Sequence, residues 1–202
     1  MSQHTVEPFS QQLKKWTQSD QKKTLETLLK VFKEKSFAII FFLMLALAAL
    51  PLPTGGLTHL TELVAMLVCL QLIVGRKSVW LPKSWKKRDI SAIVEGKAAA
   101  KLVAFIAWFE KYSRQRLGWL LNKQITLSLL GLFILTYTVA AFSAPPFSGL
   151  DTLPAMGVVI ISLGIILEDF FVSLLGIVIG AVGVGLILAA GAAIYSGFTH
   201  FF

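Results

Sequence analysis

The chain has 202 residues, of which 55% are hydrophobic and only 15% are charged, and its mean hydropathy is +0.73. A soluble domain has roughly a quarter of its residues charged. Here every Lys and Arg lies between Lys14 and Lys123, a segregation that favours a membrane protein over a soluble one. The net charge of +8 comes without zinc-ligand spacing or a recognition-helix pattern, which excludes nucleic-acid binding, and the single Cys69 excludes an intramolecular disulfide.

Residues 1–35 predict a cytoplasmic amphipathic segment of one or two helices. Apolar residues recur at helical spacing from Leu25 to Phe32, lysines occupy the other faces, and Ser19 or Asp20 is a candidate N-cap. Such a segment either lies on an anionic membrane surface or packs on the rest of the protein. A second apolar stripe between Phe9 and Trp16 favours the membrane surface.

Residues 36–75 predict a helical hairpin that is broken by a Pro/Gly turn. The first arm, Phe37–Leu50, has about 14 residues and a length of about 21 Å, which is short of the ~30 Å hydrocarbon core. The hairpin is therefore either re-entrant or fully spanning. Basic residues flank both ends, which predicts that the chain enters and leaves on the cytoplasmic side. The residues that break the helix are Pro51, Pro53, Gly55 and Gly56.

Residues 76–123 predict a basic connection at the cytoplasmic interface, because Trp80 and Trp85 alternate with Lys and Arg. Its segment Ala98–Phe109 is apolar but too short to cross a bilayer. We expect an interfacial linker helix there, at the membrane surface or wedged between hairpins. A crossing at this segment stays open, although it would place Lys111–Lys123 outside, against the distribution of positive charge typical of membrane proteins.

Residues 124–169 repeat the first hairpin. When Pro53 is superposed on Pro146, Gly56 pairs with Gly149 without a gap, and three leucines pair in the same register. Apolar segments interrupted by Pro and Gly at corresponding places in two halves indicate the binding site of a transporter. The alternative is that any two tight turns look alike, because Pro and Gly make most of them. The residues that break the second hairpin are Pro145, Pro146 and Gly149.

Residues 170–202 predict a Gly-rich transmembrane helix. Gly176 and Gly180 form a G-x-x-x-G motif, which lets helices approach closely in lipid. The motif favours packing inside the chain, with a homo-oligomer through this face as the alternative. The predicted fold is thus an all-α membrane protein with two repeated hairpins, an amphipathic N-terminal helix, an interfacial linker helix and a C-terminal transmembrane helix.

Glu62 is the strongest candidate site residue, because a carboxylate inside an apolar segment is expensive and points to function. His59 with Glu62 could relay a proton, and Thr58 and Thr61 could add oxygen ligands for a small cation. The alternative is structural, with Glu62 favouring the helix N-terminus and a threonine capping it. Desolvation favours the neutral acid, whereas the helix end and hydrogen bonds favour the carboxylate.

The second hairpin offers Asp151 and Thr152 at the corresponding place, with Asp151 expected to cap the following helix. Gln71 is a lone polar residue that fits an interhelical hydrogen bond better than a ligand. Three scattered histidines argue against a metal site, and no phosphate loop, zinc-protease motif or nucleophile elbow is present. We therefore expect neither an enzyme nor a cofactor, and the expected partners are the lipid bilayer and a small cation or proton.

The order of segments resembles the ExoD family of bacterial membrane proteins. The resemblance spans roughly Leu25 to Asp169. The residues that carry it are Leu50–Pro53, Leu70–Arg76, Trp80-Leu81-Pro82, Phe109–Lys111 with Arg114 and Arg116, Thr152–Met156 and Leu163–Asp169. The resemblance implies a multi-pass protein of the bacterial inner membrane, with a cytoplasmic N-terminus, connected with exopolysaccharide production or alkaline tolerance. Two functions remain open: a transporter or channel-like protein for a small ion or proton, and a non-transporting accessory or scaffold subunit of an exopolysaccharide or envelope complex.

Overall fold

The computed structural model describes residues 8–50, 57–91, 97–113, 116–145 and 147–201. Within these ranges the fold is all-α, as predicted, and Thr24 and Asp89 form a single isolated β-bridge. A 3₁₀ turn, Lys33–Lys35, joins the second and third helices. The helices are α1 (Phe9–Gln18), α2 (Leu25–Val31), α3 (Ser36–Leu45), α4 (Leu57–Ile73), α5 (Lys83–Lys86), α7 (Lys97–Tyr112), α8 (Gly118–Leu121), α9 (Gln124–Ser143), α10 (Thr152–Leu167) and α11 (Phe170–Phe201).

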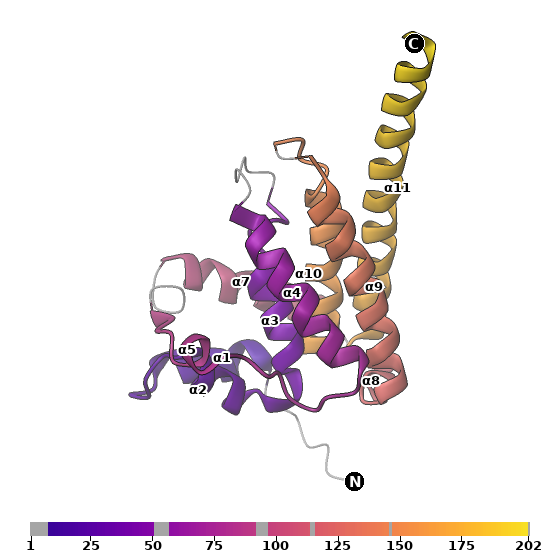
Figure 1. Cartoon of the computed structure of the whole chain (residues 1–202). Coiled ribbons are helices and arrows are strands. Elements are labelled where there is room, and N and C mark those ends of the chain that lie inside the picture. Colours follow the sequence, from indigo (N-terminus) through magenta and orange to yellow (C-terminus); the bar gives the residue numbers. More distant parts are fainter. Residues whose placement is uncertain (1–7, 51–56, 92–96, 114–115, 146, 202) are drawn as a thin grey trace.

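Four apolar helices form the centre of the molecule (Figure 1). Within each hairpin the two arms pack together, α3 with α4 and α9 with α10. Between the hairpins, α3 packs on α10 and α4 packs on α9. Because α3 corresponds to α9 and α4 corresponds to α10 in the repeat, these two contacts are equivalent. This is the arrangement expected of two repeats related by a pseudo-twofold axis. The helix α10 lies innermost, and its side chains from Gly157 to Leu167 are all buried.

The ends of α4 and α10 confirm the register of the repeat. After α4, the Arg76 N–H donates to Gln71 O and the Gly75 N–H donates to Leu72 O, with Gly75 in the left-handed region at φ 85°. These two bonds define a Schellman motif, which satisfies the last carbonyls of a helix. After α10 the same pair runs from Asp169 to Gly164 and from Glu168 to Ile165, with Glu168 at φ 56°. Superposing Pro53 on Pro146 places Gly75 on Glu168, so both helices end at the same place in the repeat.

The helix α11 has 32 residues and is about 48 Å long. Its first half packs on α10, where a Cβ built on Gly157 would lie 2.5 Å from the Gly180 Cα. Gly176 faces Ile161 of α10 in the same way, so the G-x-x-x-G motif is used for packing inside the chain. A dimer through Gly176 and Gly180 would need a face that the chain itself covers. The second half of α11 extends beyond the bundle (Figure 1).

Two of the described helices are long and apolar enough to cross a membrane, namely Gln124–Ser143 and Phe170–Gly197. The apolar helices α3, α4 and α10 are shorter. At 17 residues α4 is about 25 Å long, below the ~30 Å of a hydrocarbon core.

The N-terminal segment corrects the preference for a membrane-surface helix. It forms two helices whose apolar residues are buried in the protein core, including Phe9, Leu13 and Trp16. The helix α1 packs on α7, and the Glu110 carboxylate accepts hydrogen bonds from the Phe9 N–H at 2.6 Å, the Ser10 N–H at 3.3 Å and the Ser10 hydroxyl. A side chain distant in sequence thus satisfies the first N–H groups of α1. The local sequence pattern of residues 1–35 does not reveal Glu110 as a partner, because Glu110 is about a hundred residues away.

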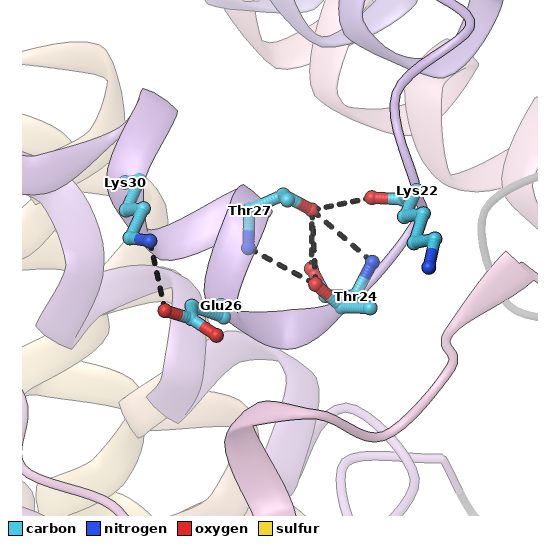
Figure 2. Close-up of polar contacts among 5 residues, drawn as sticks. All are labelled: Lys22, Thr24, Glu26, Thr27 and Lys30. Carbon is cyan, nitrogen blue, oxygen red and sulfur yellow. Dashed lines mark hydrogen bonds and ion pairs between the residues drawn. The ribbon is translucent and has the colours of Figure 1, made fainter. Parts of the chain in front are cut away.

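The N-cap of α2 also differs from the prediction. Thr24, rather than Ser19 or Asp20, caps the helix: its hydroxyl accepts from the Thr27 N–H, and the Thr27 hydroxyl accepts from the Thr24 N–H (Figure 2). Such a reciprocal pair satisfies two N–H groups that have no partner inside the helix. Glu26, in the first turn of the helix, forms an ion pair with Lys30 in the last turn at 2.8 Å.

The predicted linker helix is α7, which has 16 residues and lies against α1. Ile106 is buried, whereas the aromatic side chains of Phe105, Trp108 and Tyr112 are exposed at helical spacing. An exposed aromatic face is typical of helices at the membrane–water interface. The packing on α1 does not support a position wedged between the hairpins.

Candidate functional site

The first turns of α4 carry four of the predicted site residues. Thr58 and Glu62 are buried, with exposed fractions of 1% and 0%, whereas His59 and Thr61 are partly exposed. Capping and the helix dipole act within the first turn of a helix. Glu62 is the sixth described residue of α4, so its carboxylate lies beyond that turn. The Thr61 hydroxyl donates to Thr58 O at 2.8 Å, which is bonding within the helix. The geometry therefore does not support the interpretation of Glu62 and Thr61 as caps.

The Glu62 carboxylate lies next to the His59 imidazole. Glu62 Oε2 is 3.2 Å from His59 Nδ1, close enough for an ion pair when the imidazole is protonated. Despite this distance, neither Glu62 oxygen nor His59 Nδ1 has a well-directed hydrogen bond to any described residue. A buried carboxylate without hydrogen bonds is rare, because burial of such a group costs free energy that nothing repays.

The second hairpin reaches the same place. The His59 ring lies 5.2 Å from the Phe142 ring at the end of α9, measured between centroids. Asp151, just before α10, interacts electrostatically with Glu62. In Figure 1 the end of α9 and the start of α10 lie at the same end of the bundle as the start of α4. The second hairpin thus places Phe142 against His59 and Asp151 within electrostatic range of Glu62, and the described part of the chain places no Lys or Arg ion pair on either acid.

Asp151 occupies the predicted N-cap position of α10 but does not cap it. Its side chain accepts no capping hydrogen bond, and its backbone is already helical at φ −67° and ψ −26°. Its carboxylate is therefore available to the site. Thr152 is the first residue of α10 and is partly exposed at the same end.

Gln71 lies outside the site. It is nine residues beyond Glu62, about 13 Å along the helix axis. Its amide bonds the backbone of Trp80, donating to Trp80 O at 3.2 Å and accepting from the Trp80 N–H at 2.7 Å. Gln71 therefore fixes the chain that follows α4, and its bonds are to a loop rather than to another helix.

The turn residues are described only in the second hairpin. Pro51, Pro53, Gly55, Gly56 and Pro146 lie outside the described residues. Pro145 O accepts from the Ser148 N–H at 3.2 Å, and Gly149 has φ 69°, a left-handed conformation that glycine adopts without strain.

Phe142 is the site residue that sequence reasoning missed. It is an apolar residue within an apolar arm, and no local signal separates it from its neighbours. Only its register in the hairpin, near the turn, would have placed it beside the first turns of α4. Among the described residues no three His, Cys, Asp or Glu side chains gather where they could hold a metal ion.

The arrangement can share a proton between His59 and Glu62. An imidazole and a carboxylate at 3.2 Å can share a proton, and a second carboxylate nearby adds negative charge that attracts a cation. The ring of Phe142 lies beside the imidazole, with the two ring planes tilted by 47°.

Comparison with known proteins gives one family and one relative. The family model described as exopolysaccharide synthesis, ExoD, matches residues 9–189. A protein of Synechocystis sp. that carries only the description uncharacterized is 27% identical over 157 residues, which cover 76% of this chain and 72% of the relative. No solved structure matches the chain.

Proposed function

The chain belongs to the ExoD family, which is linked to exopolysaccharide synthesis, and from this premise we propose that it moves a proton or small cation across the bacterial inner membrane. The site lies where the two hairpins meet, at Glu62, His59 and Asp151. The observation that carries the proposal is the Glu62 carboxylate, which is fully buried in an apolar helix and lies 3.2 Å from the imidazole of His59, its one ion-pair partner among the described residues.

Burying a carboxylate whose one described partner is an imidazole removes its hydration, and replacing a buried ion pair by apolar residues is often neutral or stabilising. At the equivalent position of the second repeat the chain has Ala155, which is buried and uncharged. The second repeat thus fills the equivalent position with a small apolar residue, and the carboxylate at position 62 of the first repeat points to chemistry rather than packing.

The distribution of charge supports an orientation in the membrane. The basic connection between the hairpins and the ion pair of Lys35 with Glu168 at 2.9 Å both belong to the ends of the hairpins away from the turns. Cytoplasmic loops are enriched in Lys and Arg. We therefore place this end in the cytoplasm together with the N-terminus, with α9 and α11 as full spans.

The test is a flux assay with the purified chain in sealed vesicles, under imposed H⁺, Na⁺ and K⁺ gradients. Glu62→Gln removes the charge and keeps the shape, and we expect at least a tenfold loss of flux with an unfolding temperature that does not fall and that rises if the buried charge lowers stability. Glu26→Gln is the matched control, because it makes the same change at a partly exposed side chain of α2, far from the turns, whose ion-pair partner among the described residues is Lys30. Flux through the control protein should equal that of the unchanged chain.

A different function has one observation in its favour. The connection exposes a dense set of cations, namely Arg76, Lys77, Lys83, Lys87, Arg88, Lys111, Arg116 and Lys123. Such a face suits an accessory or scaffold subunit that binds an acidic partner in an exopolysaccharide or envelope complex. No flux in any gradient, with full activity of Glu62→Gln in exopolysaccharide production, would favour this function over transport.

A further inference from the structure

One face of α4 is apolar and uncovered. While α10 is buried from Gly157 to Leu167, α4 exposes a stripe of side chains that recur every three or four residues. From its first to its last residue the stripe is about 21 Å long, more than one leaflet of a ~30 Å hydrocarbon core. Its members are Leu60, Leu63, Leu67, Leu70 and Val74.

The stripe ends in a hollow of about 430 Å³. Leu70 and Val74 supply its apolar side, and Gln71, Arg76 and Trp80 supply the rest. The Schellman turn at Gly75 carries Arg76 into this lining, and the two bonds between Gln71 and the Trp80 backbone fix Trp80 at its other edge. The end of α4, the Schellman turn and the bonds between Gln71 and Trp80 thus shape the hollow.

The polar groups of the hollow leave one charge available. The Gln71 amide is bonded to Trp80, and Arg76 takes part in none of the ion pairs among the described residues. The guanidinium group presents a planar fork of donors that matches the oxygens of a phosphate. The Trp80 ring is 60% exposed, and an indole prefers the boundary between hydrocarbon and water.

We propose that this hollow binds one anionic phospholipid, with the lipid phosphate on Arg76 and an acyl chain along the α4 stripe. Charge complementarity selects an anionic headgroup, because the segment that follows Arg76 adds Lys77, Lys83 and Lys86 and raises the local positive potential. The proposal rests on the membrane placement given under the proposed function but not on the chemistry of Glu62. The bound lipid would hold the connection against the end of α4.

The experiment uses the full chain in a neutral detergent. Phosphatidylglycerol and phosphatidylcholine with identical acyl chains are titrated, and bound lipid is counted by native mass spectrometry while the unfolding temperature is recorded. We expect one phosphatidylglycerol per chain and a rise in unfolding temperature that phosphatidylcholine does not reproduce. Arg76→Gln should reduce the fraction of lipid-bound protein at least fivefold, and Leu70→Asn should also reduce it by disturbing the apolar side.

Lys77→Gln is the matched control, because it removes the same charge from the next residue, which does not line the hollow. Equal losses in Arg76→Gln and Lys77→Gln would overturn the proposal in favour of diffuse attraction by the basic segment. Equal binding of both lipids, or the same stabilisation by inorganic phosphate alone, would also overturn it. Glu62→Gln separates the two proposals, since it should abolish flux and leave lipid binding unchanged.

Discussion

The contact between α10 and α11 predicts a large effect of a single methyl group. In Gly157→Ala the new Cβ would lie 2.5 Å from the Gly180 Cα, 2.7 Å from the Gly180 N and 2.9 Å from Gly176 O. All three are backbone atoms, so no side chain can rotate away. Because carbon atoms in contact prefer about 3.5–4.0 Å, α11 must move outward by about 1 Å.

Such overpacking costs about 1–3 kcal/mol. For a chain of this size each kcal/mol lowers the unfolding temperature by about 2–4 °C, so we expect a decrease of about 2–12 °C. The measurement is thermal unfolding in detergent followed by circular dichroism. Gly191→Ala is the matched control in α11, because a Cβ there meets no atom within 4 Å. It should leave stability unchanged or raise it by up to about 1 kcal/mol through helix propensity. If Gly157→Ala lowered the unfolding temperature no more than Gly191→Ala, the close packing of these helices would be refuted.

Three further predictions concern the parts of the fold around the bundle. Glu110→Gln weakens the hydrogen bonds at the start of α1 and should cost about 1–2 kcal/mol, seen as faster proteolysis within residues 8–24 while α9–α11 stay protected; equal cleavage of both proteins would contradict it. Gly75→Ala forces a side chain into the left-handed region and should lower stability by about 1–2 kcal/mol, whereas Gly185→Ala, in open space, serves as the neutral comparison in the same melting assay. The pKa of Glu26 is lowered by its hydrogen bond and ion pair with Lys30, so the small stabilisation from this pair is present above about pH 4.5 and is lost as the pH falls through the lowered pKa. NMR titration of Glu26 should show that Lys30→Gln moves the pKa of Glu26 back up. An unchanged titration curve would show that Lys30 does not lower this pKa.

The repeat was the part of the fold that the sequence predicted best. Pro and Gly mark the turns through backbone geometry that depends on residue type alone, and the register of the match extends to Gly75 and Glu168, where both helices end in the same motif. The N-terminal segment was predicted less well. Its apolar stripe needs cover, but the cover comes from α7 and from Glu110, which is separated from Phe9 by about a hundred residues. Local pattern predicts that a face is buried and does not identify what buries it.

In the candidate site, too, the sequence predicted the local features and missed those that depend on packing between distant segments. Glu62 and His59 were predicted because polar groups in an apolar helix are conspicuous in composition, and their distance of 3.2 Å follows from their spacing of three residues on one helix. Phe142 could not be predicted, since its role depends on the packing of α9 beside α4. The capping role expected of Asp151 was wrong for a related reason. Its type and position suited a cap, but its backbone is already helical, whereas a capping residue has non-helical angles, and its side chain makes no capping hydrogen bond.

The two acids of the site break the symmetry of the scaffold that holds them. In the register of the repeat, Glu62 corresponds to Ala155 and Asp151 corresponds to Thr58, so each hairpin supplies one carboxylate and places an uncharged residue opposite the other. A strictly symmetric repeat would have set two identical carboxylates against each other across the axis, where like charges in a medium of low dielectric constant repel strongly. The divergence keeps both acids at one end of the bundle while giving them different surroundings, Glu62 buried beside His59 and Asp151 partly exposed at the start of α10. Under the proposed function the two acids would have different roles, because Glu62 is buried beside an imidazole and Asp151 is partly exposed at the turn. The asymmetry within the repeat thus separates one acid that can share a proton with His59 from a second acid that acts only through its charge.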